Sequence, residues 1–181
     1  MEPLVTTYLE MGRADCALAR QTLDQKFRVH EFKEPKWIFN RDMYNAVGER
    51  WKWIDKRAWT DAQWDKYASD PNLRTFAGYY QDSLAGFYEL RRSEALCKPS
   101  HGGYEDEVEI AYFGLLPEFI GCGLGGPFLS SAIENAWTWA PVPSRLWVHT
   151  CNRDHPNALN NYLARGFNIY KIEQGKTASH G

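Results

Sequence analysis

The sequence has no long hydrophobic run and no excess of charge of one sign. No apolar stretch approaches the ~20 residues that a membrane-spanning helix requires. The 21 basic and 23 acidic residues leave a net charge of −2. Without a basic cluster, the charge pattern does not point to nucleic acid or to an anionic membrane surface as a partner. We therefore expect a soluble protein that binds neither.

Cysteine is scarce and unpaired in the sequence. No Cys-x-x-Cys pair occurs, and no cluster of His, Cys or Asp has the spacing of metal ligands, so we expect no metal site. Residues 1–4 lack the charged and apolar regions that begin a secretory leader, which favours the cytoplasm. The four cysteines are Cys16, Cys97, Cys122 and Cys151.

The length and the order of apolar patterns indicate the fold class. A chain of 181 residues is long enough for one well-buried domain, which we place at 1–174, with a disordered tail at 175–181. The order of elements predicts an α/β fold (an α+β mixed sheet) with helices on both faces. Thr60 and Gln63 form a candidate capping box. We expect strands at 4–11, 27–32, 73–80, 84–91, 108–116, 145–151 and 167–172, and helices at 40–53, 61–67, 127–137 and 156–165.

A glycine-rich turn between an apolar strand and an amphipathic helix is the most informative stretch. Four glycines fall within six residues, and a phosphate can contact successive backbone N–H groups only where no Cβ intervenes and positive φ is permitted. The helix dipole adds partial positive charge at the same place. The turn therefore predicts an anion-binding cradle formed by Gly121, Gly123, Gly125 and Gly126.

The helix after this turn has a clear start and a clear apolar face. Pro127 stands where a first helical residue would, because its missing N–H has no helical partner there. We expect the polar Ser130, Ser131, Glu134 and Asn135 to lie opposite the apolar face. The residues of that face, which we expect to pack on the sheet, are Phe128, Leu129, Ala132, Ile133, Ala136 and Trp137.

The spacing Gly121-x-Gly123-x-x-Gly126 also matches a dinucleotide-binding fingerprint, but its context does not fit. A dinucleotide fold places an acidic residue at the end of the next strand, and this strand ends with Thr150, Cys151 and Asn152. Only one more strand follows where several are required. The turn therefore favours a different phosphate-bearing ligand.

Two motifs in the second half of the chain resemble signatures of the GNAT N-acetyltransferase superfamily. The Gln/Arg-x-x-Gly-x-Gly/Ala signature, which binds the pyrophosphate of coenzyme A, matches 120–125, with Ile120 in place of Gln or Arg. The Ala-x-x-x-Tyr-x-x-x-Gly-Phe signature matches 158–167, and His155 replaces the usual Asn three residues before it. The resemblance covers 73–172.

The resemblance implies a GNAT-like acyl-CoA N-acyltransferase fold and an acetyl-CoA-dependent N-acetyltransferase. An acetyl group would pass to a primary amine of a small molecule or amino acid by direct attack on the thioester. The alternatives are a noncatalytic acyl-CoA-binding sensor, or an enzyme of this fold with another acyl donor or acceptor. We expect a monomer or homodimer. The implied coenzyme-binding residues are Phe113, Gly114, Leu115, Ile120, Gly121, Cys122, Gly123, Leu124, Gly125, Gly126, Asn157 and Tyr162.

The resemblance also assigns catalytic roles. Tyr162 would be the general acid, since a phenol with a pKa near 10 can protonate a thiolate; the alternative is a core tyrosine with a satisfied hydroxyl. The N–H of Leu115 would donate to the oxyanion. Glu109 is the favoured general base, and Glu107, a histidine (His149 or His155) or water stay open as alternatives.

Acceptor binding would fall to the aromatic N-terminal third of the chain. Five of the eight tryptophans lie between 37 and 64. Most of these rings are expected to pack under the irregular segment, while some would face the cleft and hold a cationic amine by cation–π contact. The candidates are Trp37, Asn40 and Trp51.

Overall fold

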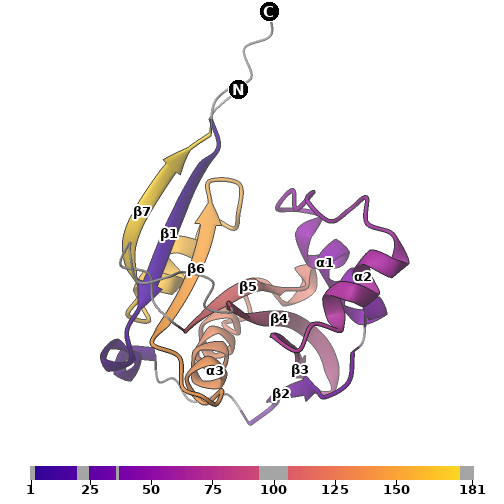
Figure 1. Cartoon of the computed structure of the whole chain (residues 1–181), viewed down its shortest axis with the longest axis horizontal. Coiled ribbons are helices and arrows are strands. Elements are labelled where there is room, and N and C mark those ends of the chain that lie inside the picture. The colour runs from indigo at the N-terminus through magenta and orange to yellow at the C-terminus, as the bar shows by residue number, and fades with distance from the viewer. Residues whose placement is uncertain (1–2, 20–24, 36, 94–105, 176–181) are drawn as a thin grey trace, which may run out of the picture.

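The computed structural model describes residues 3–19, 25–35, 37–93 and 106–175. Its strands form one mixed sheet in the order β2-β3-β4-β5-β6-β1-β7 (Figure 1). All seven predicted strands are confirmed to within two residues at each end. They are β1 (Val5–Met11), β2 (Phe27–Phe32), β3 (Leu73–Tyr80), β4 (Ser83–Ser93), β5 (Glu107–Leu115), β6 (Arg145–Cys151) and β7 (Asn168–Gln174).

The helices lie on both faces of the sheet, as the sequence predicts. They are α1 (Trp37–Gly48), α2 (Asp61–Ala68), α3 (Gly125–Trp137) and α4 (Ala158–Leu163), with 3-10 turns η1 (Arg13–Ala19) and η3 (Pro117–Phe119). The predicted loop at 93–105 and the predicted tail at 175–181 fall almost entirely outside the described residues.

The first strand lies between the last two strands of the chain. β1 pairs in antiparallel fashion with both β6 and β7, and the N–H of Gly175 donates to the carbonyl of Leu4. The two described ends of the chain consequently lie side by side (Figure 1). β5 and β6 form the parallel pair of this sheet.

The hairpin of β3 and β4 follows from its turn. Gln81 and Asp82 both have positive φ, 48° and 66°. A two-residue connection with positive φ at both positions matches the right-handed twist of the strands that it joins. The strands predicted at 73–80 and 84–91 therefore form an antiparallel hairpin.

One face of the sheet is covered by α3. The predicted apolar stripe is confirmed, since all six of its residues are buried. The expectation that Ser130 and Ser131 face solvent was wrong, because both are buried too. Ser130 donates to the Gly126 carbonyl and Ser131 Oγ lies 3.3 Å from the Tyr88 hydroxyl, so these small polar groups find partners inside.

The opposite face is covered by α1 and α2, which enclose the buried rings of Tyr44, Trp64 and Tyr67. The capping box of Thr60 and Gln63 is confirmed. The prediction of a first helix over 40–53 was wrong at both ends. The helix begins at Trp37 and ends at Gly48, where the chain folds back so closely that a Cβ on Gly48 would lie 2.6 Å from Cβ of Trp53.

Two other helix boundaries differ from the predictions. α3 begins at Gly125, two residues before Pro127, and α4 is shorter than the predicted helix over 156–165. The carboxylate of Asp154 accepts from the Cys151 N–H, so it closes the end of β6 rather than capping α4. His155 Nδ1 accepts from the N–H of Asn157 instead.

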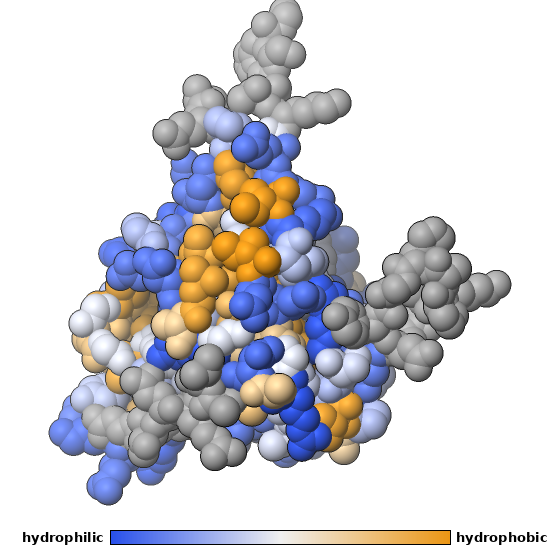
Figure 2. All heavy atoms as spheres, turned by 90° about the vertical axis from the view of Figure 1, so that its left-hand side faces the viewer, coloured by the Kyte–Doolittle hydropathy of each residue, from blue (hydrophilic) through white to orange (hydrophobic). Residues whose placement is uncertain are grey.

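The edge strand β7 is exposed over its whole length. Figure 2 shows apolar surface gathered on this side of the molecule, and the large exposed apolar side chains of β7 are Ile169, Tyr170 and Ile172. None of the helices within the described ranges is both long enough and apolar enough to cross a membrane.

Candidate active site

The central feature of the site is a split in the sheet between β5 and β6. The two strands pair only over Glu107–Glu109 with Arg145–Trp147, within the described residues, and then diverge (Figure 1). The β4–β5 register skips Ala111, which is the signature of a bulge that bends β5. The backbone of Phe113, Gly114 and Leu115 therefore has a strand partner on its β4 side and none on its β6 side.

A cavity of about 860 Å³ lies at this split. Apart from Arg91 on β4, its walls come from three segments that are distant in the sequence. These are the connection between α1 and α2, the stretch from β5 to the start of α3, and the stretch from the end of β6 through α4. A cavity at diverging strand ends is a common place for a ligand.

The glycine turn forms one end of this cavity. Gly121 and Gly123 have φ of +86° and +76°, and no atom lies within 4 Å of the place where a Cβ would be. The N–H groups of Gly125 and Gly126 belong to the first turn of α3, where a backbone N–H has no acceptor within the helix. Positive φ, open space and free helix-start amides are what an anion cradle needs.

The predicted cradle residues do not all face the cavity. Ile120, Gly121, Gly123, Gly125 and Gly126 line it. The side chain of Leu124 is buried in the hydrophobic core, and that of Cys122 is exposed with Sγ 3.9 Å from the Glu118 carbonyl. Any contact that these two residues make with a ligand would come from their backbone.

Arg165 brings a cation to the cradle, which the sequence analysis missed. It lines the cavity, and its Nε donates to the Gly126 carbonyl at 2.8 Å while its Nη1 donates to the Asn161 carbonyl. The position directly before Gly166 marks it as an ordinary basic residue at a helix end. Only the packing of α4 against the start of α3 reveals that its charge lies beside the glycine turn.

Tyr162 reaches the cavity from the buried face of α4. Its ring packs edge-on against Phe167, with the ring centroids 5.7 Å apart. The hydroxyl has no hydrogen-bond partner among the described residues, which argues against a core tyrosine with a satisfied hydroxyl. Burial raises the pKa of the phenol well above its usual value, so the group stays protonated at neutral pH.

Two titratable groups face each other at the vertex of the split. Glu109 Oε1 lies 3.6 Å from Nδ1 of His149 on β6, and both side chains line the cavity. The Glu109 carboxylate raises the pKa of the imidazole, because it stabilises the protonated form. Glu107 is engaged elsewhere, since its carboxylate pairs with Arg145 at 2.8 Å.

The end of the cavity near the α1–α2 connection is lined by aromatic and charged side chains of that connection. Trp51 lines it and contacts His155, with the rings 5.2 Å apart. Trp37 and Asn40, the other two acceptor candidates, are not in its lining. Trp37 packs against the aromatic cluster around Trp64, and Asn40 is buried.

Gly114 is required by the packing of α1 on the sheet. A Cβ at this position would lie 2.3 Å from Cγ1 of Val47. The absent side chain therefore lets α1 approach the strand beside the cavity. The last predicted site residue, Asn157, lines the cavity just before α4.

Solved structures resemble the fold at low sequence identity, and no curated protein matches the chain. A protein of unknown function from Staphylococcus epidermidis has a TM-score of 0.57 and 13% identity; the match covers 94% of this chain, which spans 60% of that one. An aminoglycoside acetyltransferase from an uncultured soil metagenomic sample, solved with trehalose, has a TM-score of 0.61 and 12% identity, with 80% and 90% covered.

A third solved structure carries a coenzyme A derivative. It is AAC(6')-Iy in complex with the bisubstrate analogue CoA-S-monomethyl-acetylneamine, with a TM-score of 0.55 and 13% identity over 86% of this chain and 97% of that one. The model of the acetyltransferase (GNAT) family matches residues 36–167, which is more than half of the sequence. The chain therefore belongs to the GNAT acetyltransferase family.

Proposed function

We propose that this protein is an acetyl-CoA-dependent N-acetyltransferase that acts on a primary amine of a small molecule. The observation that carries the proposal is that one cavity contains the glycine cradle, the open edge of β5, the Tyr162 hydroxyl and the Glu109–His149 pair. Acyl transfer from a thioester to an amine needs a group for each of these tasks.

The coenzyme would bind at the glycine turn and along the open edge of β5. The backbone N–H groups from Gly121 to Gly126 would hold the pyrophosphate, and Arg165 would supply the positive charge that Ile120 does not. Phe113 to Leu115 would hold the pantetheine arm with their unpaired backbone edge. When bound in this way, acetyl-CoA supplies the thioester that the amine attacks.

The side chains around the split would then move the protons. The Glu109–His149 pair would take one proton from the acceptor ammonium, so that a neutral amine forms the C–N bond. The N–H of Leu115 donates to the thioester oxygen as negative charge develops there. As the C–S bond breaks, Tyr162 would give its proton to the departing thiolate and would recover one from the nitrogen, which leaves a neutral amide and a neutral phenol.

The test is to incubate the protein with acetyl-CoA and a panel of primary amines. We expect release of free thiol together with an equal amount of N-acetylated amine, measured by mass spectrometry. A matched set of tertiary amines, which lack a transferable N–H, should give neither product. Tight binding of acetyl-CoA without thiol release for any primary amine would instead establish the noncatalytic acyl-CoA-binding sensor.

A further inference from the structure

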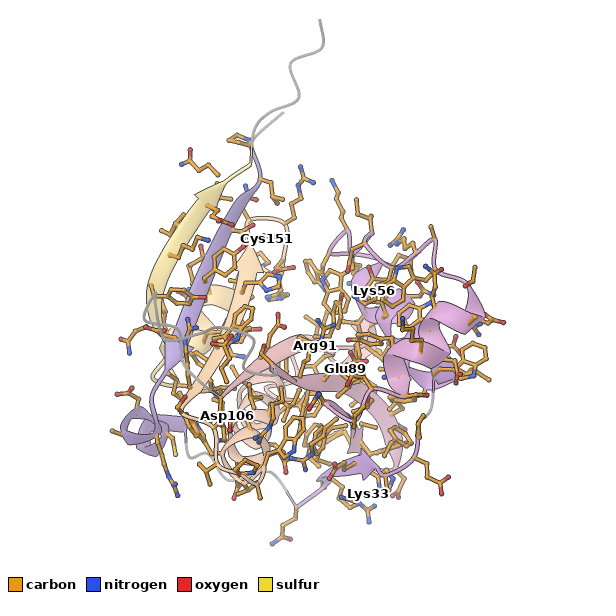
Figure 3. All side chains as sticks on the ribbon, viewed as in Figure 1. Lys33, Lys56, Glu89, Arg91, Asp106 and Cys151 are labelled. Carbon is orange, nitrogen blue, oxygen red and sulfur yellow. The ribbon has the colours of Figure 1, made fainter. Side chains whose placement is uncertain are left out.

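Arg91 brings a positive charge to the end of the cavity near the α1–α2 connection and has no carboxylate within 4 Å among the described residues. It is half-buried on β4, and its guanidinium lies over the ring of Tyr67, 5.4 Å from the centroid. Figure 3 shows Arg91 and Glu89 on the sheet below Lys56. Burial lowers the pKa of Arg91, but Tyr67 and the Glu109 carboxylate raise it by more, so the guanidinium keeps its charge without a carboxylate in direct contact.

The other arginines buried in the sheet each have an acidic partner. Arg74 pairs with Glu31 at 2.8 Å, Arg145 pairs with Glu10 at 2.7 Å, and Arg92, the next residue in β4, pairs with Asp106 at 3.0 Å. These three are structural ion pairs. Arg91 differs from them because its head group faces the cavity.

The neighbouring charged groups are already engaged with other partners. Glu89 is buried, and its carboxylate accepts from Asn40 Nδ2 at 2.7 Å and from the Tyr67 hydroxyl. The Lys56 ammonium is held by Asp55 at 3.1 Å and by the Tyr112 hydroxyl at 2.7 Å. Arg91 is therefore the cation best placed at this end to receive an anion from a ligand.

The position of Arg91 relative to the Glu109–His149 pair determines how far the anionic group of the ligand lies from its amine. Arg91 and Glu109 are directly opposite each other in the antiparallel pairing of β4 and β5. Side chains at such positions share a face, and their Cβ atoms lie roughly 5 Å apart. An acceptor whose amine lies at the Glu109–His149 pair would thus have the Arg91 guanidinium close to the groups next to that amine.

We propose that Arg91 binds the carboxylate of the acceptor, so that the acceptor is a zwitterionic amino acid in which the amine and the carboxylate are close together. This proposal rests on the proposed N-acetyltransferase function and narrows its acceptor. A planar guanidinium can donate two parallel hydrogen bonds to a carboxylate. The same charge disfavours a polycationic acceptor, which would place an ammonium group against Arg91.

The test compares acceptors that differ only in the carboxylate. Phenylalanine, phenylalaninamide and phenethylamine form one series, and leucine, leucinamide and isoamylamine form a second. We expect kcat/KM with acetyl-CoA to be about 10- to 100-fold higher for the amino acids, as a charge-assisted hydrogen bond allows. Equal or higher kcat/KM for the amides and the simple amines would overturn the proposal.

Substitutions then assign the preference to Arg91. Arg91→Gln should raise KM for the amino acids and abolish the preference, while kcat/KM for the simple amines stays within about 3-fold; Arg91→Lys should keep part of the preference. Arg28→Gln, which removes an exposed arginine charge on β2, is the matched control and should keep the full preference. An equal loss for amino acids and amines in Arg91→Gln would contradict the assignment. Thermal unfolding and acetyl-CoA affinity report whether the variants are folded.

A binding measurement separates this proposal from the function on which it rests. If no amine is acetylated, the proposed function fails, but N-acetylphenylalanine and N-phenethylacetamide can still be titrated into the protein saturated with coenzyme A. Tighter binding of N-acetylphenylalanine that is lost in Arg91→Gln would support a carboxylate site without catalysis. Equal binding of the two compounds would overturn the carboxylate site as well.

Discussion

The carboxylate of Glu109 on β5 and the imidazole of His149 on β6 lie 3.6 Å apart, across the strands that part just beyond them. The pairing that joins these strands ends at Glu109 and Trp147. The last paired position therefore brings an acid and a base together at the vertex of the cavity. The proposed proton transfer from the acceptor depends on this contact.

The first prediction concerns pH. Because Glu109 raises the pKa of His149, the wild-type kcat/KM should increase with pH through a midpoint above 6.5, as the imidazole loses its proton. Glu109→Gln removes the carboxylate, so the midpoint should move to lower pH and the plateau should fall. Use of the same acceptor for both proteins cancels the ionisation of the acceptor amine. Glu107→Gln should keep the wild-type midpoint, and an unmoved midpoint in Glu109→Gln would remove the pair from the base role.

Tyr162→Phe tests the general acid. The substitution keeps the ring that packs on Phe167 and removes a hydroxyl with no described partner, so stability should change little. Turnover should fall by about 100-fold or more, while acetyl-CoA affinity stays within about 2-fold. Tyr170→Phe on the exposed β7 is the matched control. A rate unchanged in Tyr162→Phe would leave the thiolate to be protonated by another group.

Gly123 tests the cradle, because its φ of +76° is one that side chains with a branched Cβ rarely adopt. Gly123→Val should cost roughly 1–2 kcal/mol in backbone strain or rearrange the turn, and acetyl-CoA affinity should fall at least about 10-fold. Asn tolerates positive φ, so Gly123→Asn should retain more of the affinity. Calorimetric titration measures both. Equal affinities for the two variants would mean that positive φ at this position does not shape the site.

Gly114 and Val47 form a pair whose coupling can be measured. Gly114→Ala places a Cβ 2.3 Å from Val47 Cγ1 and should lower the free energy of unfolding by about 1–3 kcal/mol. Val47→Ala alone should also destabilise, by about 2 kcal/mol, through the space that it leaves. In the double variant, the loss of free energy of unfolding should be at least about 1 kcal/mol smaller than the sum of the two single losses, as measured by denaturant unfolding. Simple additivity would show that α1 does not press on β5 at this point.

The elements that the sequence predicts well are those with local signals. The positive-φ turn of the β3–β4 hairpin, the capping box at Thr60 and the glycines before α3 are each determined by neighbouring residues. The strands beside the hairpin turn, the capping box and the glycine turn were all predicted within two residues of their place. Tyr162 lies on the buried face of α4, and its spacing from Gly166 is contained in one short stretch of sequence.

The contacts that the sequence did not reveal depend on which elements become neighbours in the fold. His149 meets Glu109 only because β6 lies parallel to β5, and Arg165 reaches Gly126 only because α4 packs on the start of α3. Trp37 and Asn40 were candidates on composition alone. The structure packs Trp37 in the aromatic cluster. It buries Asn40, whose amide nitrogen donates a hydrogen bond to Glu89.

The most direct test of the account is a calorimetric titration of the wild-type protein with acetyl-CoA and, separately, with NAD. Both ligands carry a pyrophosphate, but only a coenzyme A thioester matches a cradle that continues into the open edge of β5. We expect one acetyl-CoA bound per chain, with binding weakened in Gly123→Val, and no measurable binding of NAD. Binding of NAD without binding of acetyl-CoA would contradict it.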